Sequence, residues 1–234
     1  MIDFHVHLLP GVDDGSRNCK MSAMMLKESK RQGVTLSIAT PHFYFDKSID
    51  KMIAKREKAL CKLLKFADKN NLELPEIVTG FEVYLSEKIY EQPELDKLLI
   101  SGTNTMLVEM PRKKWDDEVF SRLEYVAEKG YEIVLAHPER YIGIADEKEF
   151  DRLFSYGFAC QLNAASMLSP VTKDFACKLI EEGKIHIIGS DAHNNGTRSV
   201  FIEIALEIIA GKFGKDFAKQ MKENAERFLC VRND

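Results

Sequence analysis

The chain has 234 residues, of which 45% are hydrophobic and 30% charged, and its formal net charge at pH 7 is −4. These values are typical of a soluble globular protein, and we expect one domain spanning residues 1–234. The small negative charge argues against nucleic-acid binding, which depends on clustered cationic side chains. Because we find neither an apolar run of about 18 residues nor an N-terminal signal segment, we expect a cytoplasmic protein without stable membrane insertion.

Four segments share one pattern, in which a charged amphipathic stretch is followed by a glycine and then by an apolar run. The glycines are Gly33, Gly130, Gly157 and Gly183. Glycine just after a helix adopts the left-handed conformation that ends the helix. Each pattern therefore indicates a helix, a tight turn and a strand.

Three more apolar segments complete the predicted strands. In chain order the seven strands are 2–7, 34–42, 76–83, 105–110, 131–137, 158–163 and 184–191. Helices are expected at 19–32, 48–70, 85–99, 116–129, 146–156, 171–182 and 199–229. Strands that alternate with helices and are almost wholly apolar imply a parallel sheet covered by helices.

Seven such strands form either an open doubly wound sheet or a (β/α) barrel. Polar side chains suited to chemistry stand at the carboxyl ends of nearly every strand, whereas an open sheet concentrates them at one switch point. The sequence therefore favours an α/β fold of the TIM-like barrel type with seven strands.

The first strand ends in His5-Val6-His7. Side chains two apart on a strand share a face, so these imidazoles can hold one metal ion. Such a pair also arises by chance, but further histidines and carboxylates follow the other predicted strands. The candidate ligands are His5, His7, Asp14, His42, Glu82, Glu109, His137, Asp191 and His193.

For any single member, a satisfied polar group at a barrel mouth is an equal explanation. As a set, converging imidazoles and carboxylates repel one another or stay unsatisfied without a cation. Nine N and O ligands exceed the three or four of one zinc site and imply two or three divalent metal ions. Without thiolates, the donors do not choose among Mn, Fe, Zn and Co. The sequence leaves open whether Asp13 replaces Asp14.

At these positions the chain resembles the PHP (polymerase and histidinol phosphatase) superfamily. More narrowly, it resembles the bacterial tyrosine-protein phosphatases encoded beside capsule and exopolysaccharide tyrosine kinases. The resemblance runs from residue 1 to about residue 200. The motifs that support it are His5-Val6-His7, Pro10–Gly15, Ala39–His42, Ala136–Tyr141 and Gly189–Asn194.

The resemblance implies a distorted seven-stranded barrel with a trinuclear site, with Mn as the foremost metal. It implies three ligand sets, which are His5, His7 and Asp191 with Glu82 as a bridge; Glu82, Glu109 and His137; and Asp14, His42 and His193. It further implies hydrolysis of phosphotyrosine on the tail of a membrane-associated tyrosine kinase of polysaccharide assembly.

Arg140 and Arg198 lie three and five residues after His137 and His193. Arginine binds phosphate bidentately, so both are candidate catalytic and substrate-binding residues. The run Phe43-Tyr44-Phe45, with Phe43 as the named candidate, could pack against the aromatic ring of a substrate, although packing at the barrel rim explains it equally well.

A cysteine-based tyrosine phosphatase needs an arginine six positions after its cysteine, and none of the five cysteines has one. The sequence therefore predicts a metal-dependent phosphomonoesterase. Two alternatives remain, a histidinol-phosphate phosphatase of the same superfamily and a non-catalytic metal-binding regulatory module.

Overall fold

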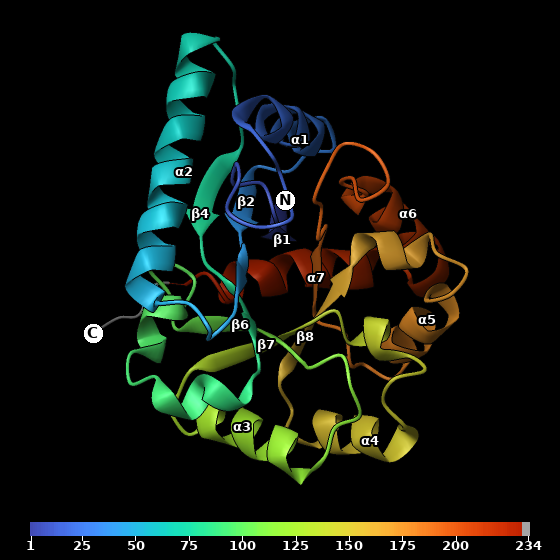
Figure 1. Cartoon of the computed structure of the whole chain (residues 1–234). Coiled ribbons are helices and arrows are strands. Elements are labelled where there is room, and N and C mark those ends of the chain that lie inside the picture. Colours follow the sequence, from blue (N-terminus) through green and yellow to red (C-terminus); the bar gives the residue numbers. More distant parts are fainter. Residues whose placement is uncertain (231–234) are drawn as a thin grey trace.

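The computed structural model describes residues 1–230, which contain nine strands in two parallel sheets (Figure 1). The smaller sheet has the order β1-β2-β4, with β1 (Ile2–Val6), β2 (Leu36–Ala39) and β4 (Glu76–Thr79). The larger sheet has the order β3-β5-β6-β7-β8-β9. Its strands are β3 (His42–Phe43), β5 (Glu82–Tyr84), β6 (Thr105–Glu109), β7 (Glu132–Ala136), β8 (Ala159–Asn163) and β9 (Ile187–Gly189).

Two of the seven predicted strands are divided, and each division moves the chain from the smaller sheet to the larger one. Pro41 separates β2 from β3, because proline has no N–H for the ladder. Gly80 separates β4 from β5, and a Cβ there would lie 3.0 Å from Cγ1 of Ile100. The divisions make His42 and Glu82 the first residues of β3 and β5, where they are register partners.

Seven α-helices within residues 1–230 surround the sheets. They are α1 (Cys19–Arg31), α2 (Ile49–Lys69), α3 (Asp117–Ala127), α4 (Glu147–Ser155), α5 (Lys173–Glu181), α6 (Ile202–Phe213) and α7 (Lys215–Arg227). Gly214, at φ 95°, divides the predicted helix 199–229 into α6 and α7. The α-helix predicted at 85–99 is absent. In its place, two 3₁₀ turns, η1 (Glu87–Glu91) and η2 (Leu95–Leu98), lie on either side of Pro93.

The sheets curl toward each other, and two backbone hydrogen bonds join β1 to the residues after β9. The N–H of Asp191 donates to the carbonyl of His5 at 2.7 Å, and the N–H of His7 donates to the carbonyl of Ala192 at 3.0 Å. We call this contact the β1–β9 junction. The predicted α/β fold with a curled parallel sheet covered by helices is thereby confirmed.

Alternation along β1 separates the core from the site. Phe4 points to α7, where its ring meets Phe228 edge-on at 6.4 Å, whereas Asp3 and His5 point to the opposite face. Similar apolar residues of four other strands pack beneath α7: Ile38, Leu107, Val134 and Ile187. Within residues 1–230, we find no helix whose length and apolar character would let it cross a membrane.

Candidate metal centre

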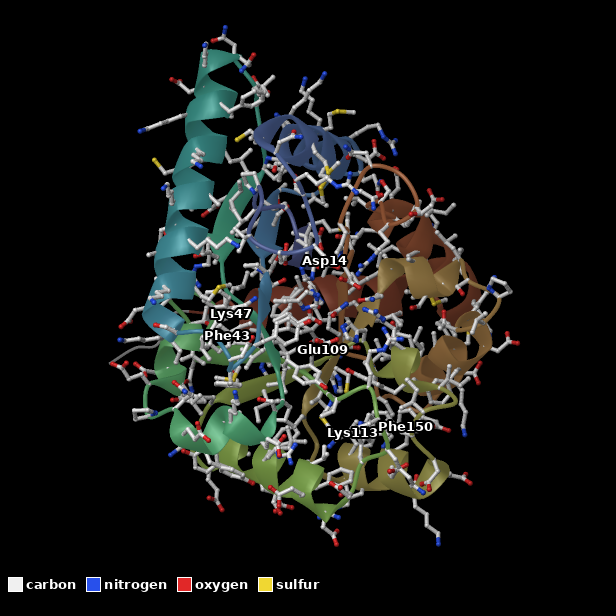
Figure 2. The ribbon with its side chains drawn as sticks, in the orientation of Figure 1. Asp14, Phe43, Lys47, Glu109, Lys113 and Phe150 are labelled. Atoms are coloured by element: carbon white, nitrogen blue, oxygen red, sulfur yellow. The ribbon has the colours of Figure 1, made fainter. Side chains whose placement is uncertain are left out.

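The structure brings all nine candidate ligands together (Asp14 and Glu109 in Figure 2). His42 and Glu82 begin β3 and β5 shortly after β2 and β4 end, Asp14 lies in the loop after β1, and the others lie at or just after the carboxyl ends of their strands. Within four groups, one ligand atom from each member lies within 4.8 Å of the others. The groups are His7, Asp14, His42 and His193; His5, Glu82 and His137; His5, His7 and Asp191; and His42, Glu82 and Glu109.

Glu82 lies at the middle of the centre and is wholly buried. Its Oε1 is 2.7 Å from Nε2 of His137, and its Oε2 is 2.8 Å from Nδ1 of His42. The same Oε2 is 3.2 Å from Nε2 of both His5 and His7. One carboxylate thus touches four imidazoles, which is the position of a bridging ligand.

The grouping differs in part from the sets that the family resemblance implies. Glu109 lies with His42 and Glu82, and His137 lies with His5 and Glu82. His7 also joins the group that contains Asp14. The difference arises because β5 is the neighbour of both β3 and β6, so Glu82 faces His42 and Glu109 together.

On the candidate ligands, four buried polar atoms have no hydrogen-bond partner within residues 1–230: Nδ1 of His42, Oε2 of Glu82, Nδ1 of His137 and Nε2 of His193. A buried polar atom without a partner costs about 1–3 kcal/mol. Imidazole nitrogen and carboxylate oxygen are the donors that Zn, Mn and Fe take in proteins. The residues present therefore fit a site for divalent cations.

Two groups outside the centre orient His5 and His7. Nδ1 of His5 lies 2.9 Å from Oε1 of Gln161, and Nδ1 of His7 lies 2.6 Å from Oδ2 of Asp13. With Nδ1 donating to these partners, Nε2 of each ring is directed into the centre, where the two atoms lie 2.9 Å apart. The sequence analysis did not identify Gln161. The one feature that could have indicated a role for it is the position of its amide side chain within the buried strand β8.

The two neighbouring aspartates have different surroundings. Asp14 lies 3.5 Å from Nε2 of His42 and 3.4 Å from Nε2 of His193. Asp13 accepts hydrogen bonds from His7 and from the N–H groups of Gly15 and His42. Burial acts to raise the pKa of Asp13, but His7 and these N–H groups hold it well below its usual range. Asp13 is therefore an ionised positioning residue.

Burial also sets the protonation state of His137. It lowers the pKa of this imidazole to about 4, against the opposing effect of Glu82. A neutral imidazole is the form that binds a metal ion. His137 is thus ready to act as a ligand at neutral pH.

Backbone geometry at the strand ends aims two of the candidate ligands. His137 follows β7 with φ 37°, and Asp191 follows β9 with φ 49°. The left-handed region costs a residue other than glycine about 1–3 kcal/mol and is concentrated at functional sites. Close packing also fixes the loop that carries Asp14 against β1. A Cβ on Gly15 would lie 2.2 Å from the carbonyl oxygen of His7, so only glycine fits at this position.

Arg140 and Arg198 lie at the edge of the centre. Nη1 of Arg140 is 2.9 Å from Asp191, and Nη2 of Arg198 is 3.3 Å from the same carboxylate. Their side chains are 27% and 38% exposed, so both reach solvent. A cavity of about 240 Å³ is lined by both arginines, Asn163 and Ser166. This arrangement suits an anion that approaches from solvent.

The substrate contact expected of Phe43 is not supported. Its ring is wholly buried and packs edge-on against Phe45 at 5.1 Å and Phe81 at 5.5 Å. The exposed aromatic residue is Tyr44, whose ring lies 5.6 Å from that of His42. Period-two alternation after His42 would have assigned these two side chains correctly.

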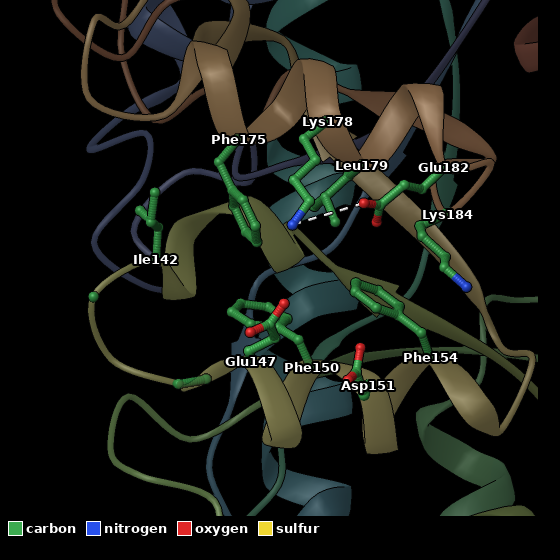
Figure 3. Close-up of a pocket in the computed structure, with 12 residues that line it drawn as sticks. Ile142, Glu147, Phe150, Asp151, Phe154, Phe175, Lys178, Leu179, Glu182 and Lys184 are labelled. Atoms are coloured by element: carbon green, nitrogen blue, oxygen red, sulfur yellow. Dashed lines mark ion pairs between the residues drawn. The ribbon is translucent and has the colours of Figure 1, made fainter.

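Another cavity of about 460 Å³ lies between α4 and α5, away from the candidate ligands (Figure 3). Its wall contains Phe150, Phe154 and Phe175, and Lys178 and Glu182 at its rim lie 3.7 Å apart. Because none of the nine candidate ligands lines it, we assign it no part in the centre.

If the centre binds divalent cations, Asp13→Asn lowers their affinity about 10- to 100-fold, the usual effect of losing such a positioning partner. The reason is that asparagine removes the charge that orients Nδ1 of His7. Calorimetric titration with Mn²⁺ measures the change, and Asp216→Asn, at an exposed position of α7, is the control. Equal affinities in the two variants would contradict the role of Asp13.

The comparisons with known proteins agree with this geometry. The chain is 32% identical to the tyrosine-protein phosphatase YwqE of Bacillus subtilis, over 100% of this chain and 92% of that protein. It is 29% identical to the tyrosine-protein phosphatase CpsB of Streptococcus agalactiae, over 98% of both. The resemblance inferred from the motifs is thereby confirmed.

Solved structures give the same result. Crystal structures described as YwqE from Bacillus subtilis and CpsB from Streptococcus pneumoniae, unique metal-dependent tyrosine phosphatases, match with a TM-score of 0.85. The match has 29% identity and covers 98% of this chain and 94% of the other. The family model for capsular polysaccharide synthesis, CpsB/CapC, matches residues 1–230. The chain therefore belongs to the CpsB/CapC family.

Proposed function

We propose that this protein is a metal-dependent tyrosine-protein phosphatase. The observation that carries the proposal is a buried centre of imidazoles and carboxylates, with Arg140 and Arg198 at its edge. The named relatives, which match over 92% and 98% of their length, support it. We infer that residues 1–234 act as a single phosphatase domain in a distorted seven-stranded barrel of the PHP type, which the β1–β9 junction supports.

We propose two or three divalent ions in the centre, with Mn foremost and Fe, Zn or Co as alternatives. Such ions supply positive charge for the phosphoryl oxygens and lower the pKa of water. The ligands would be His5, His7, Asp14, His42, Glu82, Glu109, His137, Asp191 and His193. The four unpartnered atoms at His42, Glu82, His137 and His193 support this set.

The arginines would bind the phosphoryl group. Their guanidinium groups flank Asp191 and line the cavity at the edge of the centre. Charge-assisted hydrogen bonds from both would tighten as charge develops on the phosphoryl oxygens in the transition state. Tyr44, beside His42, replaces Phe43 as the aromatic residue offered to a substrate ring.

The chain favours an aryl over an alkyl leaving group. A phenolate, with a pKa near 10, leaves with little protonation, whereas an alkoxide benefits from a general acid. Asp13 lies outside the ligand set and touches His7, which keeps it ionised, so it has no proton to give. Burial raises the pKa of Glu139 to about 7, but this carboxyl is wholly buried and accepts hydrogen bonds from Asn163 and Ser166. Phosphotyrosine therefore suits this site better than phosphoserine or histidinol phosphate.

The family supports a place in capsule synthesis. We propose that the substrate is the phosphotyrosine tail of a membrane-associated bacterial tyrosine kinase, met in the cytoplasm at the inner face of the membrane. Histidinol-phosphate hydrolysis and a non-catalytic regulatory role are the alternatives, and no contact in the structure favours either.

The test is kcat/KM for a phosphotyrosine peptide, a matched phosphoserine peptide and histidinol phosphate, each with added Mn²⁺. We expect the phosphotyrosine peptide to be the best substrate and chelation to abolish turnover until Mn²⁺ is restored. A rate on histidinol phosphate equal to that on phosphotyrosine would favour the biosynthetic alternative, and activity that survives exhaustive chelation would exclude the metal mechanism.

A further inference from the structure

Six lysines form a straight row along α2: Lys51, Lys55, Lys58, Lys62, Lys65 and Lys69. Their spacing alternates between four and three residues, which places them on one side of a helix. All six are exposed. At 1.5 Å per residue the row is about 27 Å long. We call it the lysine row.

None of the six lysines of the row makes an ion pair within residues 1–230, whereas some lysines of other helices do. The ion pairs of α2 within residues 1–230 join Arg56 to Glu57 and Asp50 to Lys97, and none includes a lysine of the row. By contrast, Lys178 and Lys219 each pair with a glutamate four residues later. With three acidic residues, α2 has a net charge of +4 in a chain of net charge −4.

Like charges at these spacings destabilise a helix by about 0.2–0.5 kcal/mol per pair. The row thus concentrates unneutralised positive charge on one exposed surface. An anionic partner would remove this repulsion on binding. The charge complementarity therefore points to a partner with a row of negative charges.

The row begins beside the metal centre. Nζ of Lys55 donates a hydrogen bond of 2.7 Å to the carbonyl of Val12, in the loop that carries Asp13 and Asp14. Lys47, which lies just before α2 (Figure 2), has its Nζ 5.6 Å from the centre of the Tyr44 ring. From there α2 runs along the edge of the molecule and extends past β4 (Figure 1).

We propose that the lysine row is a docking surface for a polypeptide segment, rich in Asp and Glu, that flanks the phosphotyrosine of the substrate. This rests on the proposed function and names the class of substrate. An extended segment of about eight residues would match the length of the row. Lysine attracts carboxylates without fixed geometry, which suits a flexible chain.

A polypeptide fits the row better than a membrane surface does. Helices that bind membranes insert bulky apolar side chains beside their lysines. Leu64 is the one large apolar side chain of α2 that is markedly exposed, at 49%. At 100° per residue it lies about 140° from the middle of the row. The row therefore presents charge alone.

The experiment compares Lys58→Gln/Lys62→Gln/Lys65→Gln with the wild type. The matched control is Lys215→Gln/Lys219→Gln/Lys222→Gln, which removes three exposed lysines of the same spacing from α7. The substrates are a phosphotyrosine peptide with six flanking glutamates, the same peptide with six glutamines, and p-nitrophenyl phosphate. Flanks before and after the phosphotyrosine are tested separately.

We expect the α2 variant to raise KM for one glutamate peptide about tenfold, within the range of electrostatic steering, with kcat unchanged. The glutamine peptides and p-nitrophenyl phosphate should be hydrolysed as by the wild type, and the α7 control should match the wild type on every substrate. Added salt should raise the wild-type KM for that glutamate peptide.

Fluorescence anisotropy with a labelled, unphosphorylated glutamate peptide measures docking without turnover. If the protein is not a phosphatase, p-nitrophenyl phosphate is not hydrolysed. If it is a phosphatase but the lysine row is not a docking surface, p-nitrophenyl phosphate is hydrolysed and only the preference for a glutamate peptide is absent. Equal wild-type KM values for all the peptides would overturn the docking proposal. The docking proposal would also be overturned if the wild type binds phosphatidylglycerol vesicles, the α2 variant does not, and the wild type shows no preference for a glutamate peptide.

Discussion

Glu82→Gln is expected to lower kcat/KM by about 10³-fold or more, because the bound ions contribute several kcal/mol of transition-state stabilisation. Glu82 touches four imidazoles, and the amide of glutamine removes the negative charge that a bridge between cations needs. The measurements are kcat/KM on a phosphotyrosine peptide and metal content of the purified variant.

Glu226→Gln, an exposed change on α7, is the control for Glu82→Gln. Circular dichroism of both variants separates loss of the site from loss of the fold. A Glu82→Gln protein that keeps its metal content and has kcat/KM within tenfold of the wild type would show that Glu82 is not a bridging ligand.

Arg140→Ala and Arg198→Ala are each expected to lower kcat/KM by about 10²–10³-fold, the usual loss for one preorganised donor. Neither arginine contributes a ligand atom, so metal content should be unchanged. Arg140→Lys, which keeps the charge, should recover only part of the loss because lysine cannot bind two oxygens in a fixed geometry.

Arg31→Ala is the matched control for the arginine variants, since Arg31 is exposed and its ion pairs are with Glu28 and Glu203, away from the centre. Normal kinetics in Arg140→Ala would remove that residue from the phosphate site. Loss of metal would instead show that Arg140 supports Asp191, which lies 2.9 Å away.

The sequence predicted which segments meet, because helix–glycine–strand patterns and polar strand ends are local signals. It did not predict that His42 and Glu82 begin separate strands. Those divisions depend on the missing N–H of Pro41 and on the contact of Gly80 with Ile100, twenty residues further along the chain. The grouping of the ligands follows from these divisions, so the sequence alone did not predict it either.

Other features of the site depend on contacts that a pattern cannot supply. The roles of Asp13 and Gln161 become recognisable only when the rings of His7 and His5 are in place. The lysine row of α2 is visible in the spacing alone. Its relation to the centre requires the hydrogen bond from Lys55 to Val12.

The β1–β9 junction has a consequence for the order of folding. His5 and Asp191 meet there through a backbone hydrogen bond, although 185 residues separate them in the chain. Contacts between residues so far apart form late, because the entropy of closing the intervening loop must be overcome first. During synthesis the ribosome releases His5 and His7 long before Asp191 and His193 exist. The centre therefore cannot be complete in a chain that ends before His193, whether nascent or truncated, which confines its chemistry to a protein that has closed this junction.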